Sequence, residues 1–117
     1  MADMTSPIVV SAMRPASTNR TVLVSFDPQS GWTFTPRYLV MDGRGSVILL
    51  RDPHDARWMF AAFDIDDPKQ FHETILADRC IVVDDWTREG PYKYVVTVSL
   101  DGQLYQSPDP QIINSGP

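Results

Sequence analysis

The chain has 117 residues and a mass of 13.2 kDa, with 10 basic and 15 acidic side chains, a net charge of −5 and a pI near 4.7. We expect one domain, 1–117, because soluble domains usually contain roughly 100–200 residues. Lys and Arg are scattered singly, which argues against a nucleic-acid partner, since phosphate contacts need clustered basic side chains. No apolar run approaches the roughly 18 residues of a membrane span, so no membrane partner is expected.

Cysteine usage and the first residues predict a cytoplasmic protein. The single cysteine, Cys80, has no second cysteine to pair with, which excludes an extracellular disulfide scaffold. The start of the chain has no basic segment, and Ile8-Val9-Val10 is too short an apolar run for a secretory signal. A chain of this length can build a hydrophobic core without metals or disulfides, and no cofactor is expected.

Proline and glycine divide the chain into short runs rich in Val, Ile, Thr, Tyr and Phe, which are typical of strands. Strands are predicted at 7–14, 20–26, 37–42, 46–52, 57–65, 79–86, 92–100 and 103–107. Many short strands with turn signals between them predict an all-β fold. The expected architecture is an immunoglobulin-like antiparallel two-sheet sandwich of about seven or eight strands, with its core over about 7–107.

Two glycine-containing segments predict hairpin turns, because glycine tolerates the positive φ that tight turns need. Asp42-Gly43-Arg44-Gly45 lies between the predicted strands 37–42 and 46–52. Asp101-Gly102 lies between the last two predicted strands, and Asp-Gly flanked by strand patterns is a strong hairpin signal.

One short helix is predicted at 68–76. Asp67 is in place to cap it, Pro68 occupies the first helical position, and Gln70 falls where a capping box has Glu or Gln. The proline-rich tail 108–117 cannot be helical. It is therefore expected to be an extended edge segment or disordered.

The segment after Gly90 predicts a half-buried strand, because apolar side chains alternate with polar ones from Tyr92 to Leu100. Gly followed by Tyr-x-Tyr at the start of a strand is similar to the tyrosine corner of immunoglobulin-type sandwiches, in which a tyrosine hydroxyl bonds back to the backbone. Tyr92 is the candidate for that contact. Tyr94 is then expected to point inward, where antibody domains have a cysteine.

The C-terminal region carries a family resemblance. The Asp101-Gly102 hairpin is followed by Tyr105-Gln106-Ser107-Pro108-Asp109-Pro110-Gln111-Ile112-Ile113-Asn114. This segment resembles the DP-EP family of small bacterial proteins of unknown function. The resemblance implies a β-sandwich and a bacterial source, and it brings no catalytic residue.

The predicted strand 57–65 is apolar on both faces. Strict alternation places Met59, Ala61, Phe63 and Ile65 on one face and Trp58, Phe60 and Ala62 on the other. A sandwich strand normally leaves one face polar, so the second face needs a cover from the helix, the tail or another subunit. Trp58 and Phe60 are therefore predicted to bind a partner, and we expect a homo-oligomer.

Two further groups are candidates for ligand contacts. Trp32 lies in a predicted loop beside Gly31, where an aromatic side chain is suited to contact an unknown protein or small ligand. Asp64, Asp66 and Asp67 are metal candidates, since calcium binds several converging oxygen atoms. The pattern lacks the glycine and distal glutamate of an EF-hand, so a solvated turn with Asp67 as a helix cap is the alternative interpretation.

Signatures of catalysis are missing from the sequence. It has no Gly-x-Ser-x-Gly, no P-loop and no His-Glu-x-x-His, and a Cys80–His72 pair is disfavoured because the predicted strand buries Cys80. The chain is therefore predicted not to be an enzyme. The expected function is a non-catalytic binding or assembly module, and the alternative is a calcium- or carbohydrate-binding sandwich that uses the acidic cluster or the Trp32 loop.

Overall fold

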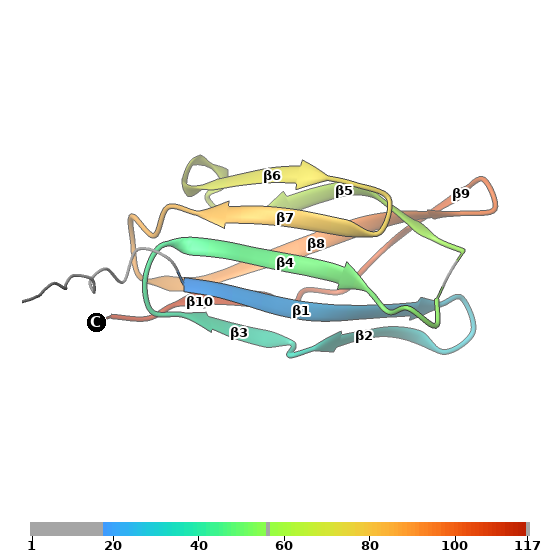
Figure 1. The fold of residues 1–117 in the computed structure, drawn as a ribbon, viewed down its shortest axis with the longest axis horizontal. Helices are drawn as coiled ribbons and strands as arrows, with labels where there is room; N and C mark the ends of the chain where they lie inside the picture. Colours follow the sequence, from blue (N-terminus) through green and yellow to red (C-terminus); the bar gives the residue numbers. More distant parts are fainter. Residues whose placement is uncertain (1–17, 56, 117) are drawn as a thin grey trace, which may run out of the picture.

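The computed structural model of the chain describes residues 18–55 and 57–116. These residues form two mixed five-stranded sheets, which confirms the all-β prediction and is consistent with a sandwich (Figure 1). The strands are β1 (Thr18–Asp27), β2 (Gly31–Thr35), β3 (Tyr38–Met41), β4 (Gly45–Arg51), β5 (Met59–Ile65), β6 (Phe71–Ile75), β7 (Arg79–Asp84), β8 (Gly90–Leu100), β9 (Gln103–Gln106) and β10 (Gln111–Asn114).

Sheet one has the strand order β2-β1-β4-β7-β6, and sheet two has the order β3-β10-β8-β5, with β9 also paired to β8. Two pairs are parallel, β1 with β4 and β3 with β10, and the others are antiparallel. The predicted purely antiparallel arrangement is therefore wrong for these two pairs. Every predicted strand from 20–26 onward overlaps an observed one, and the predicted strand 7–14 lies outside the described residues.

The predicted helix 68–76 is wrong beyond its first turn. Only Pro68–Gln70 is helical, as a 3-10 turn, and Phe71 has the extended angles φ −125° and ψ 136°. Asp67 sits at φ 50° without a capping hydrogen bond to the backbone. The chain continues instead as β6, whose backbone pairs with β7 and whose Phe71 side chain enters the core. The pairing with β7 therefore overrides the local helix signals.

The two predicted turns differ in outcome. Asp101 and Gly102 have φ of 52° and 80°, and Leu100 pairs with Gln103, so they form a two-residue hairpin turn between β8 and β9. The segment 42–45 is a turn but does not close a hairpin. It carries the chain from β3 in sheet two to β4 in sheet one, so the flanking strands pair with other partners.

The apolar strand β5 contains a β-bulge. Phe60 pairs with Val98 and Ala62 pairs with Thr97, so Ala61 is an extra residue on β5. The bulge interrupts the alternation, and Phe60 and Phe63 both enter the core, each 6% exposed. The prediction that Trp58 and Phe60 form an outer face is therefore wrong, since Trp58 is 2% exposed.

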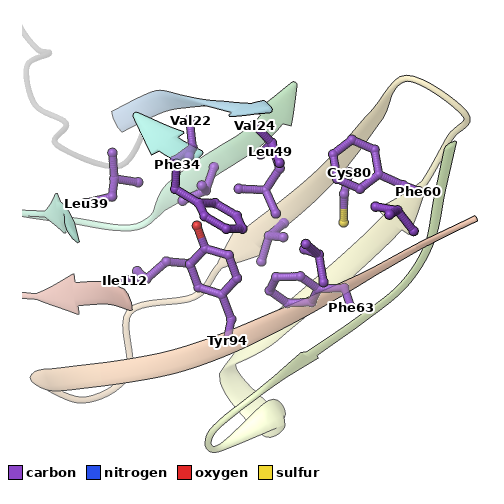
Figure 2. Packing of buried hydrophobic residues seen from close by; sticks show 14 of the residues in the cluster. Val22, Val24, Phe34, Leu39, Leu49, Phe60, Phe63, Cys80, Tyr94 and Ile112 are labelled. Carbon is purple, nitrogen blue, oxygen red and sulfur yellow. The ribbon is translucent and has the colours of Figure 1, made fainter. Parts of the chain in front are cut away.

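The core between the sheets is rich in aromatic side chains (Figure 2). Tyr94 of β8 lies between Phe34 of β2 and Phe63 of β5, with ring centroids 6.0 and 5.5 Å away. The tail forms β10, which lies between β3 and β8, and Ile112 is fully buried. The tail is thus extended, but it is an inner strand of sheet two and not an edge segment.

Candidate functional site

Three connections meet at one end of the fold, on the right in Figure 1. They are the β1–β2 turn, the β4–β5 loop and the β8–β9 hairpin turn. Loops carried by a rigid β scaffold are common places for binding, because they vary in shape while the sheets hold them in position. This loop end is the candidate functional site.

The loop end contains a cleft of about 370 Å³. Its walls combine apolar, acidic and basic side chains: Phe26, Asp27, Pro28, His54, Asp55, Arg57, Trp58 and Leu100. An apolar lining with a few polar groups is the usual composition of a ligand site.

Asp55 accepts more hydrogen bonds than any other side chain that lines this cleft, counting those between described residues. Its Oδ2 atom accepts hydrogen bonds from Ser25 Oγ at 2.8 Å, the Phe26 backbone N–H at 2.8 Å and Trp58 Nε1 at 3.2 Å. The parallel ladder between β1 and β4 ends at Val24, so Asp55 takes the Phe26 N–H that β4 does not reach. The other oxygen, Oδ1, has no hydrogen-bond partner among the described residues.

The charges around Asp55 are mostly negative. Asp27 accepts from the backbone N–H groups of Gln29 and Ser30, and these hydrogen bonds lower the pKa of the Asp27 carboxyl. A hydrogen bond from the His54 backbone N–H, together with the His54 ring, lowers the pKa of Asp52 in the same way.

Arg57, the guanidinium that lines the cleft, is already paired with Asp101 of the hairpin turn. Arg51 does not line the cleft, and its Nη1 donates to the Trp58 carbonyl at 2.6 Å. Of the carboxylates and guanidinium groups that line the cleft, two are acidic, Asp27 and Asp55, and one is basic, Arg57, whose charge is offset by Asp101. The loop end therefore favours a positively charged ligand.

The three aromatic residues predicted to bind partners occupy different environments. Trp58 and Phe60 are core residues in edge-to-face contact, 5.0 Å between ring centroids. Trp32 is half-buried on strand β2, a strand that the sequence pattern did not predict, and its ring lies 4.3 Å from that of Phe26. Trp32 therefore supports a wall of the cleft through Phe26.

The three aspartates predicted as metal candidates do not converge. Asp64 and Asp66 line a shallow depression of about 300 Å³ on sheet two, together with Lys93 and Asp109. Asp66 accepts a hydrogen bond from the Lys93 backbone N–H at 3.1 Å, whereas Asp67 accepts one from Gln70 Nε2 at 3.0 Å. Within residues 18–55 and 57–116, no three His, Cys, Asp or Glu side chains are arranged to hold a metal ion.

The remaining candidates are structural. The Tyr92 hydroxyl donates to the backbone carbonyls of Arg88 at 2.9 Å and Glu89 at 3.1 Å, the contact expected of a tyrosine corner. Cys80 is fully buried, and burial raises the pKa of its thiol to about 12. The exposed His72 bonds instead to Asp85 at 2.8 Å, so Cys80 and His72 form no catalytic pair.

Sequence reasoning missed His54, Asp55 and Arg57 as site residues. The signal that could have found them is the polar, proline-containing segment Asp52-Pro53-His54-Asp55 between two apolar strands. Two of the three donors that fix Asp55 come from β1, 29 and 30 residues away, and no local pattern encodes those contacts.

Comparison with protein-family models and with curated proteins finds no match for this chain. Among the residues that the structure describes, no helix is both long and apolar enough to cross a membrane.

Proposed function

We propose that the chain is a non-catalytic binding module whose loop-end cleft binds a positively charged group of a partner. The observation that carries this proposal is Asp55, since three donors fix one carboxylate oxygen and the other has no partner among the described residues. A side chain that is already ordered loses little conformational entropy on binding. The carboxylate of Asp27, which also lines the cleft, strengthens the attraction for a cation, and Asp101 offsets the positive charge of Arg57.

An immunoglobulin-like architecture is part of the proposal. The order β4-β7-β6 corresponds to strands B, E and D of that fold, and β5-β8-β10 corresponds to C, F and G. Tyr92 near the start of β8 supports the same assignment, as does the inward Tyr94 two residues later. In this assignment the β4–β5 loop, which carries Asp55, is the B–C loop that antibody variable domains use for binding.

The proposal is tested by titration with N-acetylarginine amide, a capped guanidinium, followed by ¹H–¹⁵N NMR. The indole N–H of Trp58 and the amide N–H of Phe26 are built-in reporters, because both donate to Asp55 Oδ2. Saturable shifts of these two signals are expected. The neutral analogue N-acetylglutamine amide should leave them in place.

Two variants separate a specific site from general attraction to an acidic protein. Asp55→Asn keeps an oxygen acceptor for the three donors but removes the charge, and it should bind about tenfold more weakly, equivalent to about 1.4 kcal/mol. Asp64→Asn removes a carboxylate from the other depression and should bind like the wild type. Equal weakening in both variants would refute a site at Asp55.

A carbohydrate ligand is the alternative proposal. The tilted Trp32–Phe26 pair beside the cleft is the observation that favours it, since sugars stack on aromatic faces. Titration with methyl glucoside separates the two proposals, because a neutral sugar should perturb Trp32 without dependence on the charge of Asp55.

Self-association is a separate proposal. The exposed apolar side chains Tyr38 and Val40 on edge strand β3, 54% and 48% exposed, are the observation that favours it. Native mass spectrometry should give a multiple of 13.2 kDa if it is correct. We also propose that the chain is a cytoplasmic bacterial protein of the DP-EP family. The segment from Tyr105 to Asn114 supports the family and the source, and the single cysteine supports the location.

A further inference from the structure

A buried polar cluster lies where β7 and β10 end, and these strand ends are at the end of the fold opposite the three connections, on the left in Figure 1. Its side chains are Asp84 at the end of β7, Asn114 at the end of β10 and Gln70 of the 3-10 turn, exposed by 0%, 2% and 2%. Because β7 belongs to sheet one and β10 to sheet two, the cluster connects the two sheets.

The Asn114 amide is the hub of this cluster. Its Nδ2 atom contacts Asp84 Oδ1 at 3.2 Å, Gln70 Oε1 at 3.3 Å and the Arg88 carbonyl at 3.3 Å. Asp84 Oδ1 also accepts the Trp86 backbone N–H at 2.8 Å. One oxygen of the carboxyl group is therefore well satisfied.

The other oxygen of the Asp84 carboxyl group and the oxygen of the Asn114 amide have no hydrogen bonds to any described residue. Asp84 Oδ2 and Asn114 Oδ1 are both buried without a hydrogen-bond partner among the described residues. Both are acceptors when Asp84 is ionised, so the ionised form leaves two buried acceptors unpaired. Such groups cost roughly 1–3 kcal/mol each when no donor reaches them.

Among the described residues, no positively charged side chain compensates the charge of an ionised Asp84. The residue that follows β7 is Asp85, which carries the same sign and bonds to His72 of β6. The 3-10 turn brings Asp67, which holds Gln70 Nε2. Along the approach to β8, Arg88 and Glu89 have exposed side chains, and Arg88 enters the cluster through its carbonyl. The phenol of Tyr92 donates to that same carbonyl.

We propose that Asp84 is a neutral carboxylic acid in the folded protein and that its Oδ2–H donates to Asn114 Oδ1, forming a proton-dependent latch between the sheets. A single proton supplies the donor that both unpaired atoms lack. The carboxylic acid and the amide then form a reciprocal pair, with Asn114 Nδ2 donating to Asp84 Oδ1 and Asp84 Oδ2 donating to Asn114 Oδ1. Burial raises the pKa of Asp84, which acts in the same direction.

The latch makes stability depend on pH in a defined direction. In the unfolded chain Asp84 ionises at its ordinary value of about 3.8, whereas in the folded protein it ionises only at higher pH. The folded state therefore binds more protons between these two values, and stability from this group decreases as pH rises through that window. The contribution is complete below pH 3.8.

The variant Asp84→Asn tests the latch, because an amide at this position carries a permanent donor where the acid has its proton. Its Tm should equal that of the wild type near pH 4 and exceed it at pH 7, by about 4 °C or more. The matched control is Asp85→Asn, which removes a neighbouring charge without touching Asn114. This control should leave the difference in Tm between pH 4 and pH 7 close to that of the wild type.

A direct measurement keeps the proposal testable if a variant fails to fold. The side-chain carboxyl ¹³C shift of Asp84 in the wild-type protein should stay at the protonated position well above pH 3.8. An ionised shift at pH 6, or an Asp84→Asn variant that is less stable than the wild type at pH 7, would overturn the latch. The second result would indicate a buried water that donates to an ionised Asp84.

Discussion

The same chemical change, Tyr to Phe, is expected to have opposite effects at two positions of β8. Tyr92→Phe removes a hydroxyl that donates to the carbonyls of Arg88 and Glu89. Tyr94→Phe removes a hydroxyl that is buried with no hydrogen-bond partner among the described residues. Both rings stay in the core, at 5% and 1% exposure in the wild type.

The magnitudes follow from the partners of each hydroxyl. After Tyr92→Phe, the Arg88 carbonyl keeps Asn114 Nδ2 as a donor, whereas the Glu89 carbonyl loses its Tyr92 donor. A loss of about 1–2 kcal/mol in the free energy of unfolding is expected, and a decrease in Tm of about 4–10 °C.

At the other position, Tyr94→Phe relieves the burial of an unpaired hydroxyl and should stabilise the fold by about 1–2 kcal/mol. Figure 2 shows that hydroxyl directed in among core side chains near Phe34 and Leu39. The ring contacts with Phe34 and Phe63 do not involve the oxygen, so the packing is retained.

Urea unfolding followed by tryptophan fluorescence measures both effects. The slope of the transition should be unchanged in both variants, because neither substitution alters the surface exposed on unfolding. Destabilisation of similar size in both variants would refute the reasoning, since it would show that the Tyr94 hydroxyl has a hydrogen-bond partner. Leu39→Ala is a useful reference for a purely apolar loss in the same layer of the core.

Three further predictions concern other parts of the fold. Cys80 should not react with a thiol reagent at pH 8 in the folded protein, because burial raises the pKa of its thiol to about 12. It should react fully in urea. Rapid labelling without urea would contradict its burial. Gly102→Val should lower the free energy of unfolding by about 1–2 kcal/mol, because Gly102 has φ +80°. Gly102→Asn should lower it by less, and equal thermal stabilities of the two variants would argue against backbone strain. Deletion of Ala61 should cost at most about 1 kcal/mol by thermal unfolding, because Ala62 still pairs with Thr97 and Phe60 and Phe63, then two positions apart, both still face the core. Loss of the folded state on deletion would count against Ala61 as the extra residue of a bulge.

Strands with strong local patterns were predictable from the sequence. In β8 every second side chain from Tyr92 to Leu100 faces the core, as the alternation predicts. Asp101-Gly102 forms the predicted hairpin turn. In both cases the information lies within a few residues, because side-chain alternation and positive φ are local properties.

The errors arose where distant partners decide the conformation. Residues 71–75 follow a helix-like start, yet they form β6 because β7 offers a full set of backbone partners. The bulge at Ala61 is set by the register against β8, and it places Phe60 in the core instead of on the predicted outer face. Asp55 is recognised as a site residue only from its contacts with Ser25 and Phe26, which are distant in sequence.

The inner position of β10 has a consequence for how the protein is made. Among the described strands, β3 pairs with β10 alone, and Tyr38 lies opposite Gln111 across more than seventy residues of chain. At about 5–20 residues per second, the ribosome delivers β10 roughly 4–15 s after β3. During that interval neither edge of β3 is paired with another described strand, and the strand carries the apolar side chains Tyr38 and Val40. A chaperone that protects the nascent chain is therefore expected to bind residues 38–41 during that interval.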